Sequence, residues 1–163
     1  MNTKTKKLST VSMVLCGMFA ALVAIGAFIQ IPVPYMDYFT LQFFFVLLAG
    51  LILGADKGAI SVGCYVLLGL VGVPIFAAGG GIGYIFRPSF GYLVGFIVSA
   101  YVTGKVCEKL KASYKNYLLA CLAGFVVTYA IGIVYKFIIL NFYAHTPATL
   151  GVIFLSCFPL DMP

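Results

Sequence analysis

Residues 8–30, LSTVSMVLCGMFAALVAIGAFIQ, form an uncharged and almost wholly apolar run. A transmembrane helix needs about 20 such residues to cross a hydrocarbon core roughly 30 Å thick. Lys4, Lys6 and Lys7 stand directly before the run, as basic residues do in a signal peptide. The run is too long for the apolar region of such a peptide and lacks a clear small-residue cleavage site. We therefore expect a retained first membrane span.

The rest of the chain repeats this pattern. Of its 163 residues, 63% are hydrophobic and 9% are charged, whereas a soluble domain carries about 25% charged residues. Further apolar runs, bounded by proline, glycine or charged residues, predict spans at about 39–54, 59–73, 89–106 and 117–140, and a partial apolar segment at 148–163. We expect a single all-α membrane domain made of a helical bundle.

Seven of the ten basic residues are grouped in two places. Three lysines precede the first span, and four more, Lys105, Lys109, Lys111 and Lys115, crowd the end of the span 89–106 and the short loop that follows it. Alternating crossings put both groups on the same side, and the positive-inside rule assigns that side to the cytoplasm. The net charge of +6 therefore indicates topology rather than nucleic-acid binding. We expect a multi-pass protein of the cell membrane with a cytoplasmic N-terminus.

Residues for catalysis or metal binding are scattered. The five cysteines never form a CxxC pair, so neither a zinc site nor a disulfide framework is indicated. Acidic residues that could serve as acid, base or metal ligand occur only at Asp37, Asp56, Glu108 and Asp161, without clustering in the sequence. A glycine-rich stretch is present, but it lacks the GxxxxGK[ST] pattern of nucleotide-binding loops. We expect no enzyme, no metal and no cofactor.

The glycine-rich stretch between two spans is the most informative part of the chain. Residues 76–83 hold four glycines. The only arginine, Arg87, comes four residues later and directly precedes Pro88. Irregular backbone at membrane depth is tolerated only where it is buried in protein or lines a cavity. The planar guanidinium suits a carboxylate, so Arg87 is either a contact for an anionic ligand or an interfacial residue that reaches out to water. Asp161, beside an apolar run, is either a functional residue or a marker of the water interface.

The first span contains two ladders of small residues that step by four. Cys16, Ala20 and Ala24 form one ladder, and Gly17 and Ala21 form the other. Small residues at this spacing let two helix backbones approach closely inside lipid. Two interpretations remain open, namely packing within this chain and docking of another membrane subunit.

Several short segments, in this order, resemble motifs of one family. They are PVP at 32–34, FTLQ at 39–42, LAGLILG at 48–54, GLVGVPIF at 69–76 and PSFGYLVGF at 88–96. Together they resemble the BioY family, the biotin-binding membrane subunits, or S components, of energy-coupling factor (ECF) transporters. The resemblance implies a six-helix bundle that captures biotin from outside. It also implies partners, namely a transmembrane coupling protein and two cytoplasmic ATPase subunits, because the S component itself hydrolyses no ATP.

The resemblance also implies functional residues. In the family, the glycine loop and the following PSGGYL segment border the vitamin, and a small-residue face of the first helix meets the coupling protein. The implied ligand-binding residues of this chain are Gly79, Gly80, Gly81, Ser89, Gly91 and Tyr92. The implied docking residues are Cys16, Ala20 and Ala24.

The chain departs from the family pattern at two places. Phe90 replaces the first glycine of the GGYL motif, which narrows the space there. Pro159 and Asp161 match the start of a PxDxxxK-like element, but the matching lysine would lie beyond residue 163. From this we expect a truncated last span, and either the sequence is a fragment or the ligand site is incomplete.

Biotin has an apolar body, a ureido group and a carboxylate, so its pocket needs aromatic walls and a few placed polar groups. We expect walls that include Tyr92, ureido contacts from Asp161 and loop backbone, and carboxylate contacts from Arg87 or Ser89. The alternatives are an S component for another vitamin-like molecule and, in a different class, a small pore or a structural membrane protein. A pore would require a polar stripe along several spans, whereas these spans are nearly uniformly apolar.

Overall fold

The structure, a computed structural model, describes residues 9–31, 39–111 and 113–143. Its long helices are α1 (Thr10–Phe28), α2 (Gln42–Leu53), α3 (Ala55–Val71), α4 (Phe90–Lys109) and α5 (Tyr114–Ile138). Shorter elements are the strands β1 (Gln30–Ile31) and β2 (Phe39–Thr40), the 3-10 helix η1 (Ile82–Phe86) and the π-helix η2 (Ile139–Tyr143). The all-α prediction is confirmed apart from the two short strands. The predicted apolar segment 148–163 and Asp161 lie outside the described residues.

Helix boundaries follow local chemistry as well as hydrophobicity. The side chain of Ser9 accepts the backbone N–H of Ser12 at 3.2 Å and so caps the start of α1. The helix α3 ends at Gly72, which adopts a left-handed conformation with φ of 118°. The helix α2 begins three residues later than the predicted start at 39, because β2 pairs antiparallel with β1 there. Apolar composition alone does not reveal so short a pairing.

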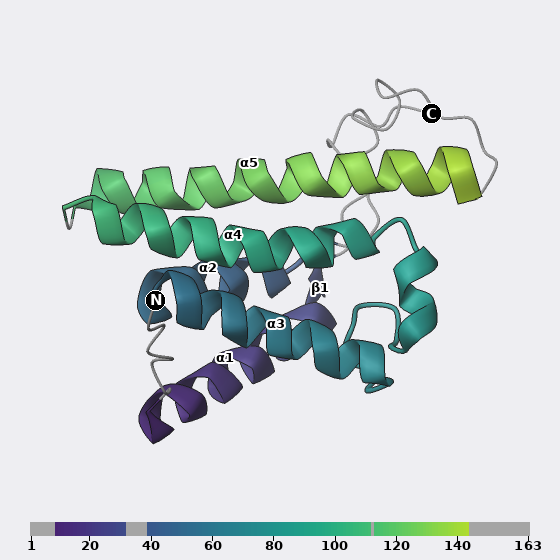
Figure 1. Ribbon diagram of the computed structural model, residues 1–163, viewed down its shortest axis with the longest axis horizontal. Helices are drawn as coiled ribbons and strands as arrows, with labels where there is room; N and C mark the ends of the chain where they lie inside the picture. The colour runs from purple at the N-terminus through teal and green to yellow at the C-terminus, as the bar shows by residue number, and fades with distance from the viewer. Residues whose placement is uncertain (1–8, 32–38, 112, 144–163) are drawn as a thin grey trace, which may run out of the picture.

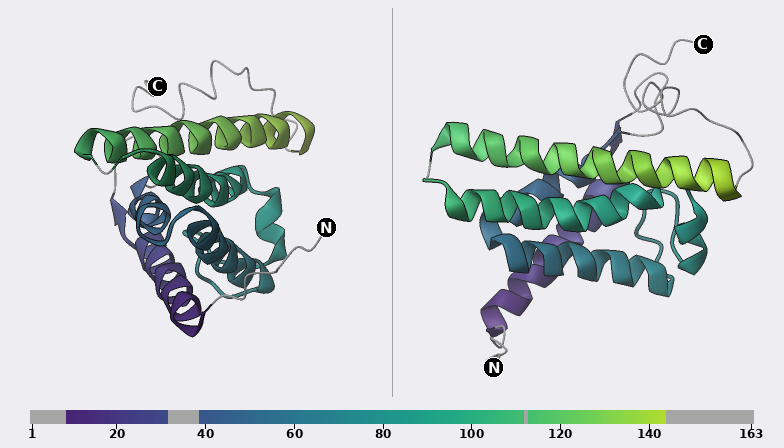
Figure 2. Two further views of the ribbon diagram at one scale, coloured as in Figure 1. Left: turned by 60° about the vertical axis from the view of Figure 1, so that its left-hand side comes forward. Right: turned by 45° about the horizontal axis from the view of Figure 1, so that its top comes forward.

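The helices form two layers (Figures 1 and 2). The helices α4 and α5 run antiparallel, side by side, and α4 lies over α2 and α3. The helices α1, α2 and α3 all contact one another and make up the second layer. The 3-10 helix η1 lies beyond the end of α3 and leads into α4. The loop from α3 to α4 therefore occupies one end of the bundle, and the α4–α5 turn occupies the other.

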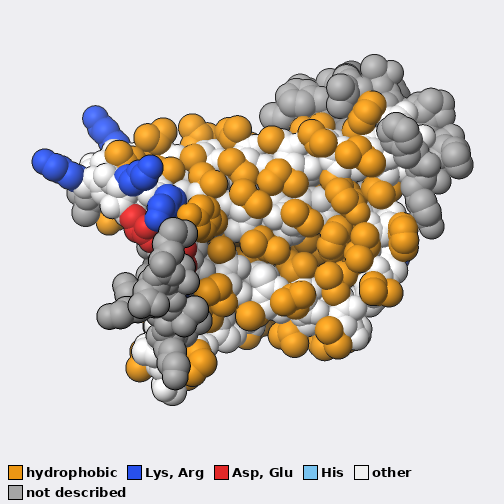
Figure 3. Space-filling view, viewed as in Figure 1, with side chains coloured by type: hydrophobic (Ala, Val, Ile, Leu, Met, Phe, Trp, Pro, Cys, Tyr) orange, Lys and Arg blue, Asp and Glu red, His pale blue; other side chains and the backbone are white. Residues whose placement is uncertain are grey.

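The surface is apolar along the helices. Exposed large hydrophobic side chains occur on all five long helices, and examples are Val14, Phe44, Leu67, Val98 and Val126. In Figure 3, hydrophobic side chains cover most of the visible face, while the lysines gather at the end where α4 meets α5. Within the described residues, three helical stretches are long and apolar enough to cross a membrane, at Thr10–Phe28, Phe90–Lys109 and Tyr114–Asn141. Such a surface suits lipid rather than water.

The interface between α4 and α5 is built from small residues that step by four. The α4 ladder is Gly91, Gly95, Ser99 and Thr103, and the α5 ladder is Ala120, Gly124, Thr128 and Gly132; all are buried. A Cβ added at Gly95 would lie 3.0 Å from the backbone oxygen of Thr128. The Thr103 hydroxyl donates to the carbonyl oxygen of Ala120 at 3.3 Å. Close backbone approach thus holds this pair together where no hydrophobic effect acts between helices.

Candidate ligand site at the loop end of the bundle

The glycine loop, residues 72–81, folds back on the end of α3. The backbone groups of Phe76 and Gly79 bond each other twice, at 2.9 and 3.1 Å, and the N–H of Gly81 donates to the carbonyl oxygen of Gly69 at 2.7 Å. Gly79 and Gly81 have φ of 109° and 102°, a region that favours glycine. A side chain at Gly80 would overlap the carbonyl oxygen of Val73. The glycines therefore give the loop its conformation and its close contact with α3.

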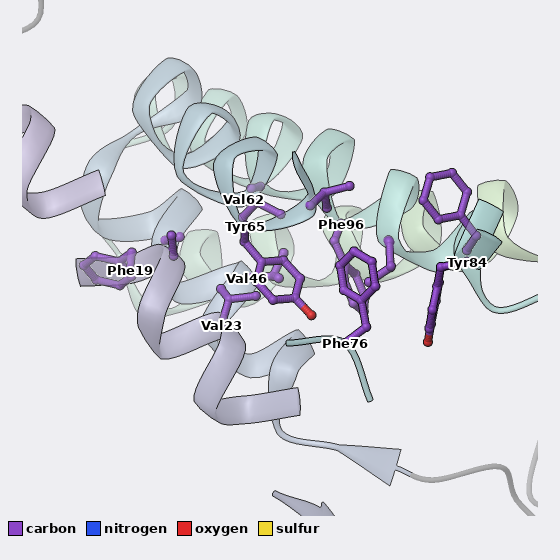
Figure 4. Close-up of a cluster of buried hydrophobic side chains, with 14 residues drawn as sticks. Phe19, Val23, Val46, Val62, Tyr65, Phe76, Tyr84 and Phe96 are labelled. Atoms are coloured by element: carbon purple, nitrogen blue, oxygen red, sulfur yellow. The ribbon is translucent and has the colours of Figure 1, made fainter. Parts of the chain in front are cut away.

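Three aromatic rings pack together where the loop meets α3 and η1 (Figure 4). The ring of Phe76 lies between those of Tyr65 and Tyr84, with centroids 5.5 and 4.6 Å away. Gly69 leaves the space that Phe76 fills, since a Cβ there would overlap its ring. The aromatic cluster of Tyr65, Phe76 and Tyr84 joins α3, the loop and η1 into one packed unit.

Arg87 and Ser89 lie at the junction of η1 and α4. The guanidinium carbon of Arg87 lies 5.4 Å from the centroid of the Tyr84 ring, within the range of a cation–π contact. Both residues are exposed. Ser89 precedes α4 without capping it through its side chain. The structure thus brings Arg87, Ser89 and Gly79–Gly81 to the same end of the bundle, where an anionic group arriving from solvent meets an accessible charge.

Gly91 and Tyr92 lie in the first turn of α4 and are directed toward α5. A Cβ at Gly91 would overlap the side chain of Tyr135, and one at Gly132 would overlap the Tyr92 ring. The ring of Tyr92 also lies 5.9 Å from that of Tyr129. In this structure these two candidate residues pack α4 against α5. Their contacts are with α5 and not with the exposed groups of the loop.

Three side chains bond carbonyl groups of the segment between α3 and α4. Tyr65 donates to Ile75 at 3.0 Å, Gln30 donates to Ala77 at 3.2 Å, and Tyr135 donates to Ile85. Gln42 in turn donates to the Tyr65 hydroxyl oxygen at 2.9 Å. Gln42 belongs to the FTLQ motif at 39–42, but neither Gln42 nor Tyr65 was predicted as a site residue. The sequence does contain a signal that could have identified Gln42. It is a polar residue at the start of an apolar run, and such residues are functional candidates in membranes.

The docking residues expected on α1 differ in how far they are buried. Cys16 and Ala20 are buried, with exposed fractions of 6% and 7%, and Ala24 is half-buried. The carbonyl oxygen of Cys16 accepts the Ser61 hydroxyl at 2.7 Å, so this ladder packs against α3. The second ladder, Gly17 and Ala21, is exposed. Packing within the chain thus accounts for Cys16 and Ala20, and the outward small-residue face is formed by Gly17 and Ala21.

Metal-binding geometry is not found in the described part of the chain. Within residues 9–31, 39–111 and 113–143, no three His, Cys, Asp or Glu side chains come together in a way that could hold an ion. The acidic residues described there are Asp56 and Glu108, at the opposite end from the glycine loop. Glu108 accepts the backbone N–H of Ala55 at 3.0 Å and pairs with Lys105 at 3.5 Å. Its contacts are those of a structural cap on α3.

Comparison with known proteins identifies relatives along the whole chain. The BioY family model matches residues 1–162. A probable biotin transporter BioY from Lysinibacillus sphaericus is 42% identical over 154 residues, which cover 94% of this chain and 78% of the relative. The biotin transporter BioY of Thermotoga maritima is 45% identical over 130 residues, 79% of this chain and 73% of the relative.

A solved structure shares the fold. It is the crystal structure of the S-component for biotin from an ECF-type ABC transporter, with a TM-score of 0.79 and 24% sequence identity. The match covers 99% of this chain and 85% of that one. The apolar helices and the family match together make this an integral membrane protein. The chain belongs to the BioY family.

Proposed function

We propose that this chain captures biotin as the substrate-binding S component of an ECF-type ABC transporter. The observation that carries the proposal is the 42% identity, over 94% of this chain, to a relative named as a probable biotin transporter. The fold is shared with an S component for biotin. Its role is to bind and deliver a vitamin, with no bond made or broken in the ligand.

The loop end of the bundle supplies groups that suit biotin. The guanidinium of Arg87 is exposed over the Tyr84 ring and is available to the carboxylate. The backbone of Gly79–Gly81 and the hydroxyl of Ser89 lie at the same end and offer hydrogen bonds to the ureido group or the carboxylate. We retain Asp161 as a proposed ureido contact. Gly91 and Tyr92 contribute by positioning the start of α4 against α5.

Transport requires the partners that S components use. We propose that a transmembrane coupling protein docks on the lipid-facing side of α1, at Gly17, Ala21 and the half-buried Ala24, and that two cytoplasmic ATPases supply the energy. Gly17 has no neighbouring heavy atom within 4 Å of a built Cβ, so a second helix can approach the backbone there.

The distribution of charge supports an orientation in the membrane. Lys105, Lys109, Lys111 and Lys115 lie at the α4–α5 turn, at the other end of α4 from Arg87. We propose that the lysine end and the N-terminus face the cytoplasm and that the glycine loop faces outward.

A direct titration tests the proposed function. The full chain in lipid nanodiscs is titrated with biotin by calorimetry. The titration is repeated in the presence of thiamine or riboflavin to test whether either competes with biotin. We expect saturable binding of about one biotin per chain, unaffected by either competitor. Displacement of biotin by another vitamin would favour a different ligand, and ion conductance without biotin binding would favour a pore.

A further inference from the structure

The segment between α3 and α4 is held by hydrogen bonds from elements far apart in the sequence. Gln30 follows α1, Tyr65 belongs to α3 and Tyr135 belongs to α5, yet each donates to a carbonyl oxygen of residues 75–85. Carbonyl groups that the packed chain shields from water need such partners. The three donors differ in burial, and Tyr65 is fully buried, with an exposed fraction of 0%.

Tyr65 acts together with a second buried polar residue. Gln42 is 3% exposed and donates from Nε2 to the Tyr65 hydroxyl oxygen at 2.9 Å. With that oxygen serving as acceptor, the hydroxyl proton is directed to the carbonyl oxygen of Ile75, 3.0 Å away. Bonds in series polarise one another and gain strength in apolar surroundings. The relay therefore connects α2 and α3 to the start of the glycine loop.

The loop needs an anchor of this kind. Gly72, Gly79 and Gly81 all adopt positive φ, and glycine loses more conformational freedom on ordering than any other residue. A loop that is already ordered before the ligand arrives avoids that cost during binding. If only a fraction of the chains holds the loop in the competent arrangement, the measured affinity falls to that fraction of its intrinsic value.

We propose that Gln42 and Tyr65 are positioning residues that hold the glycine loop in its binding conformation and thereby set the affinity for biotin. The proposal rests on the proposed function for its ligand and on the relay for its geometry. Neither side chain has to touch biotin, because both act through the carbonyl group of Ile75.

Tyr65→Phe tests the anchor, because it keeps the ring against Phe76 and removes the hydroxyl. The full chain in nanodiscs is examined by amide hydrogen exchange without ligand and by biotin titration. We expect faster exchange at residues 72–81, unchanged exchange at the α4–α5 turn, and a dissociation constant for biotin raised roughly two- to tenfold, the range of one net hydrogen bond. Tyr117→Phe, an exposed tyrosine at the opposite end, is the control and changes neither quantity.

A second variant separates positioning from general stability. Tyr65→Phe leaves the buried Gln42 amide without the oxygen to which it donates, which lowers thermal stability. Adding Gln42→Met removes that amide and is expected to restore the melting temperature. The carbonyl group of Ile75 still lacks its donor, so we expect fast loop exchange and weak binding to persist. Recovery of affinity and loop protection together with stability would overturn the proposal.

The two proposals fail in different ways. Hydrogen exchange of the ligand-free chain reports the anchor alone, so unchanged exchange at residues 72–81 in Tyr65→Phe would overturn it whatever the ligand. Absence of biotin binding by the unsubstituted chain would instead remove the proposed function and leave the exchange result to decide the anchor.

Discussion

Arg87 carries its charge where the chain passes from η1 into α4. Its backbone N–H donates to the carbonyl oxygen of Tyr84 at 3.0 Å, and its guanidinium lies over the ring of the same residue. Backbone and side chain are thus both fixed relative to η1. A guanidinium placed in this way offers a carboxylate two parallel hydrogen bonds.

Arg87→Gln should weaken binding of biotin far more than binding of biotin methyl ester. A hydrogen bond to a charged group contributes about 1.5–3 kcal/mol, or roughly ten- to a hundredfold in the dissociation constant. Titration of both ligands checks this, with Lys111→Gln at the opposite end as the control. An undiminished preference of the variant for the free acid would exclude Arg87 from the carboxylate role.

Gly69 and Gly63 lie in the same helix but in different surroundings. A Cβ at Gly69 would overlap the buried ring of Phe76, whereas Gly63 has no neighbour within 4 Å of a built Cβ. We expect Gly69→Ala to destabilise the fold by about 1–3 kcal/mol through overpacking. Gly63→Ala is expected to stabilise it by about 0.5–1 kcal/mol through helix propensity. Thermal unfolding in detergent distinguishes the two, and equal effects would argue against this packing.

The residues of the candidate site were only partly predictable from the sequence. Arg87 and the loop glycines stand out because the chain has a single arginine and because four glycines fall within the eight residues 76–83. Tyr65 does not stand out, because an isolated tyrosine in such a run has the same appearance whether its hydroxyl is bonded or not. Only the folded chain brings it to Gln42 and to the loop carbonyl of Ile75.

Among the elements, α1 shows what hydrophobicity cannot decide. The length and place of this helix follow from its apolar run. Both of its small-residue ladders step by four, and the family resemblance implied docking at the ladder Cys16, Ala20 and Ala24. The structure turns Cys16 and Ala20 toward α3 and leaves Gly17 and Ala21 exposed. Which ladder is buried depends on the position of α3, and a single helix does not encode that position.

Ala21→Trp should prevent co-purification with the coupling protein while leaving biotin binding intact, because bulk on the exposed face keeps a second helix away. Ala20→Trp should instead lower the yield of folded chain, since Ala20 is buried. Val126→Trp, on the exposed side of α5, is the control for a large residue facing lipid. Normal assembly of the Ala21→Trp variant would show that this face is not the docking surface.

The whole molecule has two chemically different ends joined by apolar helices. The glycine loop, Arg87 and the aromatic cluster occupy one end, and the lysines of the α4–α5 turn occupy the other. Charge counting along the sequence anticipates this polarity, because each span reverses the direction of the chain. The hydrogen bonds from β1 and α3 to the glycine loop, and from α5 to η1, depend on the packed bundle and are not visible in charge or hydropathy.

Cysteine labelling in whole cells tests the orientation. In a chain whose five native cysteines are replaced, Ile82→Cys should react with a membrane-impermeant maleimide from outside. Lys111→Cys should react only after the cells are permeabilised, because the positive-inside rule places it in the cytoplasm. The reverse labelling pattern would contradict the proposed orientation.

We propose that biotin binds at the loop end of this bundle. Amide hydrogen exchange of the full chain in nanodiscs, with and without saturating biotin, measures this directly. We predict slower exchange at residues 72–89 and no change at residues 105–117. Protection at the lysine end with an unaltered loop, or no protection at any biotin concentration, would contradict the claim.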